Sequence, residues 1–188
     1  MRTNTKKLTL NALLLAIGLL LHQLTPAMGR PMQPDMSLIM LFTIMIINKG
    51  DYKTSLVCGI VTGIFTALTT KFPGGQLPNI IDKIITVNVV YILMFISYKL
   101  PFMKKAKEKT QDFIVSIIIL PIGTLISGMS FLLSANLIVG LPGSFEALFL
   151  VAVAPAIIIN LVFGIFFFKV ISMSVNRLGY KNLKSLNK

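Results

Sequence analysis

Long apolar runs separated by short polar connections dominate the pattern of this chain. Six runs are bounded by charges or by Pro and Gly, and they cover residues 8–25, 36–47, 54–70, 80–98, 113–139 and 145–171. A bilayer core of about 30 Å needs about 20 apolar residues per helical crossing, so five runs predict membrane-spanning helices. The second run, with about 12 residues, is short for a crossing and predicts a tilted, irregular or partly interfacial helix. We therefore expect an all-α integral membrane protein with six transmembrane helices in a single domain, residues 1–188.

The composition agrees with a membrane protein and argues against an enzyme. Of the 188 residues, 55% are hydrophobic and 13% are charged, and a soluble domain of this size could not bury so much apolar side chain. The single cysteine, Cys58, excludes an internal disulfide, and together with the single histidine, His22, it offers no soft-ligand metal cluster. The sequence also lacks a phosphate-binding loop ending in Lys-Ser/Thr and the common hydrolase signatures. We expect no catalytic residue, metal site or cofactor in this chain.

The positive charge is distributed unevenly between the two sides of the predicted bundle. The formal net charge is +12, which in a soluble protein would suggest nucleic-acid binding. Fifteen of the 18 Lys and Arg residues fall at the two termini and in the connections after the second and fourth runs. Only Arg30, Lys71 and Lys83 fall on the other side. The positive-inside rule therefore predicts a multi-pass protein of the cell membrane with both termini in the cytoplasm, and no nucleic-acid partner.

The predicted outer side is the better candidate for specific recognition. Six of the nine prolines fall in its connections, with glycines beside them, which predicts rigid, tightly turned loops. Three acids, Asp35, Asp82 and Glu146, open the second, fourth and sixth runs on this side. Each could cap its helix or stabilise its first turn. Alternatively, because all three lie at one level of the membrane, they could face a shared pocket.

A pocket for a zwitterionic amino acid needs an acceptor for the ammonium, a donor or cation for the carboxylate, and an apolar or aromatic slot. Lys83 adjoins Asp82 and could either pair with it or contact a ligand. We predict that one acid receives the ammonium, and that Lys83 or the amides of an outer helix N-terminus receive the carboxylate. The candidate substrate-binding residues are Gln76, Asn79, Asp82, Lys83, Glu146, Asp35, Asn88, Asn136 and Phe145. Further aromatic residues that could wall the slot are Phe72, Phe131, Phe149 and Tyr91.

Small and polar residues inside the runs predict how the helices pack. The patterns Ala12-x-x-x-Ala16 and Gly59-x-x-x-Gly63 allow close helix approach, and their simplest use is packing within the chain. Asn160 is a candidate for a hydrogen bond between helices. His22 receives no role, because no partner for it follows from the sequence.

The segment Lys71–Lys83, with its Pro-Gly-Gly-Gln loop, and the preceding segment Gly59–Thr70 resemble the tryptophan transporter family TrpP. That family is one of the substrate-binding S components of energy-coupling factor (ECF) transporters, and the resemblance covers nearly the whole chain. It implies an ECF S-component-like bundle with an outward pocket for L-tryptophan. It also implies an ECF T component and two cytoplasmic ATPase subunits as partners, which hydrolyse the ATP, and release of substrate inside by toppling in the membrane.

In such proteins an alanine motif in the first span docks on the partner, and Ala12 and Ala16 match this motif. Two alternatives remain open. The chain could be a self-sufficient, homo-oligomeric amino-acid carrier, or a non-transporting membrane accessory protein that binds no ligand.

Overall fold

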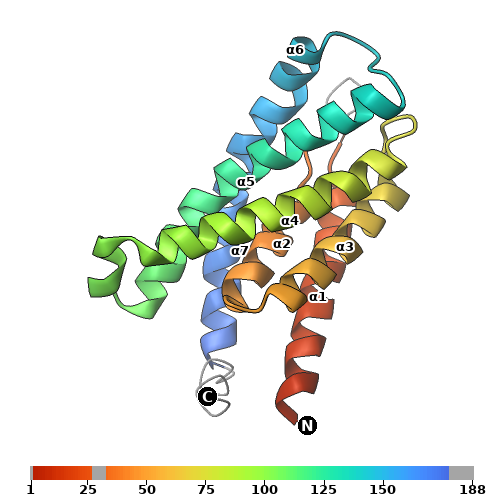
Figure 1. Cartoon of the computed structure of the whole chain (residues 1–188). Helices are drawn as coiled ribbons and strands as arrows, with labels where there is room; N and C mark the ends of the chain where they lie inside the picture. Colours follow the sequence, from red (N-terminus) through yellow and green to blue (C-terminus); the bar gives the residue numbers. More distant parts are fainter. Residues whose placement is uncertain (1, 27–32, 178–188) are drawn as a thin grey trace.

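The computed structural model describes residues 2–26 and 33–177, and all regular structure in this part of the chain is helical (Figure 1). The elements are α1 (Arg2–Leu24), α2 (Ser37–Ile47), α3 (Tyr52–Thr69), α4 (Gln76–Lys99), the 3-10 turn η1 (Pro101–Lys105), α5 (Glu108–Ile138), α6 (Phe145–Leu148), the π-helical turn η2 (Phe149–Val153) and α7 (Ala154–Arg177).

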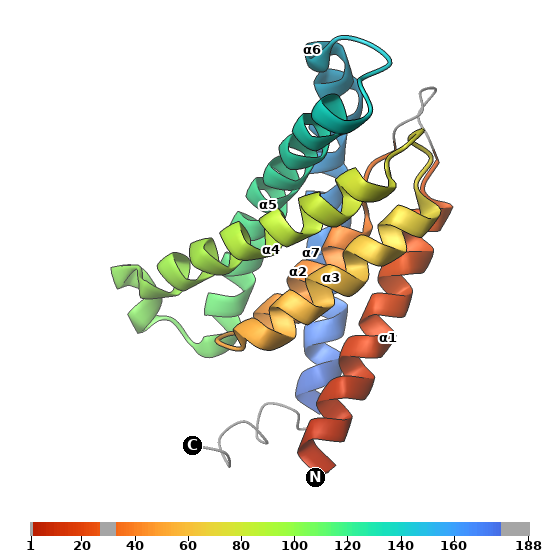
Figure 2. The same ribbon diagram turned by 45° about the vertical axis from the view of Figure 1, so that its right-hand side comes forward.

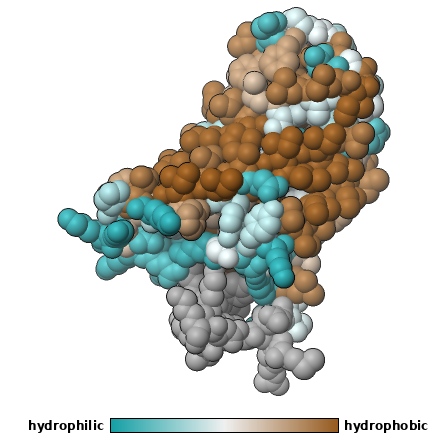
Figure 3. Space-filling model, viewed as in Figure 1, coloured by the Kyte–Doolittle hydropathy of each residue, from teal (hydrophilic) through white to brown (hydrophobic). Residues whose placement is uncertain are grey.

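The helices run back and forth between two ends of the molecule. The first residues of α1 and the last residues of α7 lie at one end, whereas α6 and the α3–α4 connection lie at the other (Figures 1 and 2). Four helices and the continuous segment Phe145–Arg177 are long and apolar enough to cross a membrane, and α2 is a shorter apolar helix. A broad hydrophobic band covers the middle of the surface, and hydrophilic residues gather at the end where α1 begins (Figure 3). The prediction of a six-helix, multi-pass membrane bundle is confirmed.

Helix α2 forms the centre of the bundle. All eleven of its residues are buried, because a helix that is apolar all round is stable only when other helices enclose it, and here α1, α3, α5 and α7 touch it. It is therefore a core helix and not an interfacial one. Its length of about 16 Å covers only half of a bilayer core. The short α2 thus leaves its N-terminal end, with Asp35 just before it, inside the bundle.

Glycines bring α3 and α4 into close contact. A Cβ atom at Gly59 would lie 2.3 Å from Cγ2 of Val87, and one at Gly63 would lie 3.2 Å from Cα of Ile80. The Gly59-x-x-x-Gly63 pattern is therefore used for packing within the chain, as predicted. This contact fixes the face of α4 that carries the buried polar residues described below.

The last span is irregular where it faces the middle of the bundle. Pro155 has no amide hydrogen, and the wide turn η2 directly precedes it, which is a common way for a helix to accommodate a proline. One turn further on, the Asn160 amide donates to the Asp35 carbonyl oxygen (2.9 Å) and to Thr124 Oγ1 (3.1 Å). The predicted bond between helices is confirmed, and it ties α7 to α5 and to the start of α2.

Candidate functional site

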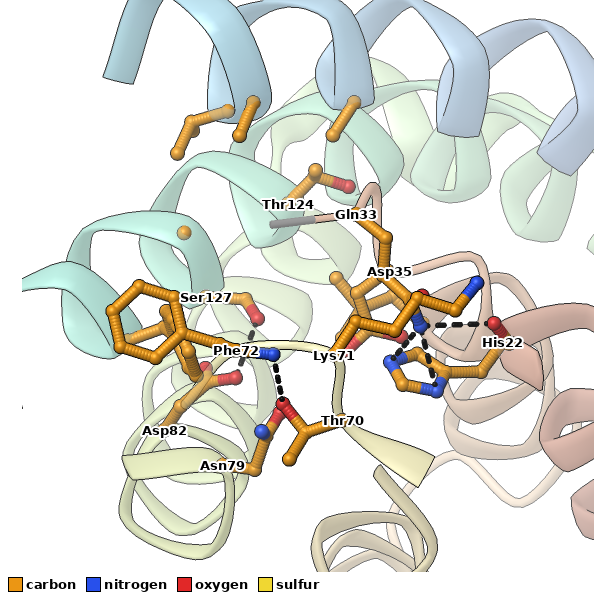
Figure 4. A pocket seen from close by; sticks show the side chains of 16 residues that line it. His22, Gln33, Asp35, Thr70, Lys71, Phe72, Asn79, Asp82, Thr124 and Ser127 are labelled. Carbon is orange, nitrogen blue, oxygen red and sulfur yellow. Dashed lines mark hydrogen bonds between the residues drawn. The ribbon is translucent and has the colours of Figure 1, made fainter. Parts of the chain in front are cut away.

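A cavity lies at the N-terminal end of α2, inside the bundle. Parts of α1, α4, α5, η2 and α7 surround it, together with the connections that precede α2 and α4. The space open to the centre of a water molecule measures about 50 Å³. The residues that line this central cavity are His22, Gln33, Asp35, Leu38, Thr70, Lys71, Phe72, Asn79, Asp82, Thr124, Ser127, Gly128, Phe131, Ala152, Val153 and Ala156 (Figure 4).

A fully buried lysine holds two carboxylates at one wall of the cavity. Lys83 has no exposed surface, and its Nζ forms ion pairs with the adjacent Asp82 and, at 2.6 Å from Oδ2, with Asp35. With all three side chains ionised, the formal charge of this group is one negative. Charges so far from water are stable only when they are paired and hydrogen-bonded, and removal of one partner costs far more than the pair contributes. The Asp35–Lys83–Asp82 cluster is therefore a structural unit that leaves one negative charge in excess.

Hydroxyl and amide groups hold the two carboxylates in fixed positions. Ser127 donates to Oδ2 of Asp82 and Thr86 donates to Oδ1, both at 2.9 Å. The amide of Ser37 donates to Oδ1 of Asp35 at 2.9 Å, and its hydroxyl donates to the same oxygen. Oδ2 of Asp35 contacts only the Lys83 ammonium and receives no well-directed hydrogen bond. Asp35 thus keeps an oxygen with acceptor capacity beside the cavity.

The ends of α1 and α3 meet at a second group of contacts, which contains no acid. Lys71 Nζ donates to the carbonyl oxygen of Thr25 at 2.6 Å, and Nδ1 of His22 lies 2.8 Å from Thr69 Oγ1. The Gln33 amide donates to the His22 carbonyl oxygen at 3.0 Å, whereas the Oε1 atom of Gln33 is buried without a donor. Lys71 and Gln33 lie over the polar half of the cavity (Figure 4). No role for His22 could be predicted from the sequence, because its hydrogen bonds join residues that are distant along the chain.

Aromatic and short apolar side chains form another part of the cavity lining, beside Ser127 and Asp82 (Figure 4). The rings of Phe72 and Phe131 pack edge to face, with their centroids 5.4 Å apart, and both side chains are buried. Opposite them, η2 and α7 contribute only the short side chains of Ala152, Val153 and Ala156. Two of the aromatic residues considered for the slot therefore lie at the cavity. An apolar slot beside a charged wall suits a ligand with one flat hydrophobic end and one zwitterionic end.

The structure brings some of the predicted site residues together and leaves others apart. Asp35, Asn79 and Asp82 line the cavity, and Lys83 lies behind its wall. Gln76, Glu146 and Asn136 are exposed outside the cavity. Asn88 accepts a hydrogen bond from the hydroxyl of Tyr52 (2.7 Å), and Tyr91 packs edge to face on the same tyrosine. Phe145 and Phe149 pack in the apolar cluster near α6. Arg30 lies outside the described residues.

The two alanines of the first span lie on the surface of the described structure. Ala12 and Ala16 are both exposed, and Leu8 and Leu20 extend their stripe at the same four-residue spacing, with exposed fractions of 73% and 57%. Residues spaced by four share one face of a helix. The alanine pattern is therefore not used for packing within the described part of the chain. It forms a flat apolar stripe, which we call the α1 stripe.

Comparison with known proteins identifies the family. The family described as "Tryptophan transporter TrpP" matches residues 4–176. The chain is 48% identical to a probable tryptophan transport protein of Clostridium perfringens over 176 residues, which cover 94% of this chain and 96% of that protein. It is 49% identical to the protein of the same description from Clostridium acetobutylicum (93% and 96% covered), and 43% identical to that of Bacillus subtilis (92% and 94% covered). No solved structure matches. The chain belongs to the TrpP family of tryptophan transporters.

Proposed function

We propose that this chain is the substrate-binding membrane subunit for tryptophan uptake and that the central cavity is its tryptophan site. The observation that carries the proposal is the lining of the cavity, which combines the charged cluster at Asp35 with the aromatic rings of Phe72 and Phe131. Tryptophan combines the matching two parts, a zwitterionic backbone and a flat indole ring. The family relationship supports this choice of substrate.

In the proposed complex, each end of tryptophan meets a complementary group. The ammonium is received by Oδ2 of Asp35 and Oε1 of Gln33, the two acceptors at the cavity that lack a well-directed donor. The carboxylate is received by Lys71, a cation on the cavity wall that donates to a backbone carbonyl and forms no ion pair within the described part of the chain. The indole occupies the slot at Phe72. Lys83 does not contact the ligand in this scheme, because two carboxylates already surround its ammonium; it positions Asp35 instead.

The mouth of the cavity must open to admit tryptophan. Ligand sites for molecules of this class usually enclose about 300–1,000 Å³, whereas the space open to water centres here is about 50 Å³. The contacts that close it run from Lys71 to the Thr25 carbonyl, between two connections, and from Gln33 to the His22 carbonyl in the last turn of α1. Neither is a hydrogen bond within a helix, so both can break while the helices stay intact. We infer that opening separates the ends of α1 and α3.

The chain works, in this proposal, with an ECF T component and two cytoplasmic ATPases, and it releases tryptophan inside by toppling in the membrane. The absence of a phosphate-binding motif from the sequence fits an energy source in partner subunits. The exposed α1 stripe supplies a docking face, because small side chains let a partner helix approach closely within lipid. Both termini lie in the cytoplasm in this arrangement.

Reconstitution distinguishes this proposal from its alternatives. The purified chain should bind tryptophan alone but transport it in liposomes only when the T component and ATPases are present. Ala12→Phe should abolish assembly and uptake while it leaves tryptophan binding unchanged. Leu13→Phe, which places the same side chain at an exposed position on another face of α1, should leave assembly, uptake and binding unchanged. Uptake by the chain alone would show a self-sufficient carrier. Absence of any ligand binding would show an accessory protein.

A further inference from the structure

A second concave site lies far from the central cavity, at the end of the molecule where α5 begins and α7 ends. Its open space is about 550 Å³ by the same measure, so it is a wide groove at the surface. We call it the basic groove; it is lined by Lys109, Asp112, Phe113, Phe168, Lys169, Ser172, Met173, Asn176 and Arg177. None of these residues takes part in the proposed tryptophan site.

The lining residues follow the periodicity of two facing helices. On α7, Lys169, Met173 and Asn176 recur at intervals of three and four residues and so form one stripe. On α5, Lys109 and Phe113 recur at an interval of four. Because α5 begins and α7 ends at this end of the molecule, Lys109 and Arg177 lie nearest the end, whereas Phe113 and Lys169 lie one and two turns deeper.

The charge of the groove favours an anion. Lys109, Lys169 and Arg177 are all exposed there. The one carboxylate of the lining, Asp112, is buried and already bound by Lys49 Nζ at 2.7 Å and by the Tyr98 hydroxyl at 2.9 Å. Lys49 is shared between Asp112 and the exposed Glu108, whose Oε1 lies 3.0 Å from Nζ, and neither Lys49 nor Glu108 lines the groove. An anion in the groove would meet three cations.

The apolar part of the lining selects the kind of anion. Met173 is 56% exposed, and Phe113 and Phe168 lie beside it in the lining. The ammonium of Lys169 lies 5.0 Å from the centre of the Phe113 ring, which holds this cation between the apolar and polar parts of the groove. A small inorganic anion would use none of this apolar surface, whereas a phospholipid would use both parts.

We propose that the basic groove binds one anionic phospholipid of the bilayer. Its phosphate contacts Lys109, Lys169 and Arg177, the hydroxyl of Ser172 donates to the glycerol ester oxygens, and an acyl chain runs past Phe113 toward the middle of the membrane. Basic pockets between membrane helices bind anionic headgroups in this way. The bound lipid bridges α5 and α7 at the end of the bundle opposite the tryptophan site.

Native mass spectrometry of the full chain, released from mixed micelles of phosphatidylglycerol and phosphatidylcholine, tests this proposal. The wild-type chain should retain one phosphatidylglycerol in preference to phosphatidylcholine. Each cation near a headgroup contributes about fivefold in affinity, so the Lys109→Ala/Lys169→Ala/Arg177→Ala variant should bind phosphatidylglycerol roughly 100-fold more weakly. The matched control, Lys53→Ala/Lys104→Ala/Lys105→Ala, removes three exposed cations outside the groove and should retain the lipid.

Three results would overturn the proposal. Equal loss of lipid from both triple variants would show general attraction to the basic end, equal retention of both lipids would show no headgroup recognition, and displacement by millimolar inorganic phosphate would show a site for a free anion. Tryptophan binding by each variant checks its fold. If the groove variant does not fold, Lys169→Gln alone should weaken phosphatidylglycerol binding about fivefold, and an unchanged affinity would equally refute the site.

Discussion

Replacement of Asp35 by asparagine is the change that most sharply tests how the ligand is held. Asparagine has nearly the same shape and keeps an oxygen that accepts the Ser37 amide, so the start of α2 should remain intact. Lys83 keeps its ion pair with Asp82. What changes is the charge of the cluster, which rises from one negative charge to zero. The ammonium of tryptophan then loses its ionic partner while the surrounding packing is preserved.

The expected size of the effect follows from the loss of one charge-assisted hydrogen bond. Such a bond contributes about 1.5–3 kcal/mol, which corresponds to roughly 10- to 150-fold in the dissociation constant. The upper part of this range is expected here, because Asp35 lies inside a membrane bundle where little water screens the interaction. The thermal unfolding temperature of the purified chain should change little by comparison.

Equilibrium dialysis with three labelled ligands separates recognition from folding. Tryptamine keeps the ammonium of tryptophan and lacks its carboxylate, and indole-3-propionate has the opposite pattern. Asp35→Asn should weaken the binding of tryptophan and tryptamine but not that of indole-3-propionate. Lys71→Met is the matched variant, and it should weaken tryptophan and indole-3-propionate but not tryptamine.

Asp35 does not receive the ammonium if Asp35→Asn binds tryptophan as tightly as the wild type does. The same conclusion follows if the variant loses affinity equally for all three ligands, because a uniform loss would mean that the mutation distorts the cavity. The same two outcomes for Lys71→Met would remove the carboxylate contact from the proposal.

Three further predictions concern stability. Lys83→Met leaves its two carboxylates buried without a counter-ion, so the free energy of unfolding should fall by about 3–5 kcal/mol, measured by thermal unfolding in detergent. Gly59→Ala forces a Cβ atom against α4 and should cost about 1–3 kcal/mol, whereas Gly143→Ala, with no atom within 4 Å, should be neutral in the same assay. Burial alone would raise the pKa of Asp51, but the Lys7 ammonium and the Thr54 amide and hydroxyl together lower it to about 2. Its ionised form therefore stabilises the fold above about pH 4, and this contribution should disappear as the pH falls from about 4 to 2.

Each of these predictions has an internal control. The free energy of unfolding that Lys83→Met loses should be partly recovered when Asp82→Asn is added, because one of the two unpaired buried carboxylates is removed. No recovery would mean that the Lys83 side chain contributes only through packing. Equal costs at Gly59 and Gly143 would contradict the close approach of α3 and α4. Asp51→Asn should flatten the pH dependence below pH 4, and an unchanged profile would assign it to other groups.

The helices could be predicted from the sequence because apolar runs of sufficient length have few other structures available in a bilayer. Helix α2 shows the limit of length as a criterion. Its 11 residues are too few to span a membrane, so the sequence predicts a tilted, irregular or partly interfacial helix. The same residues are, however, apolar on every side. The second property decides the outcome, because only the centre of the bundle buries all faces of a helix.

The site could be predicted only in part, because its charges meet across long distances in the sequence. Proximity suggested that Lys83 pairs with Asp82, but nothing local showed that Asp35 shares the same lysine. Glu146 opens its helix on the same side as these residues but stays exposed in the first turn of α6, where it suits the helix dipole. Lys71 was noted as an outer cation, yet its place on the cavity wall depends on how the connection before α4 folds over the bundle.

The central claim is that this chain by itself binds tryptophan, and the sequence offers a direct measurement. The chain contains no tryptophan residue, so indole fluorescence from the purified protein can come only from a ligand. After addition of L-tryptophan and removal of the excess, the wild-type chain should retain about one indole per chain. This indole should leave with the small-molecule fraction after denaturation. A chain that carries both Asp35→Asn and Lys71→Met should retain almost none. A wild-type chain that retains no indole would contradict the account.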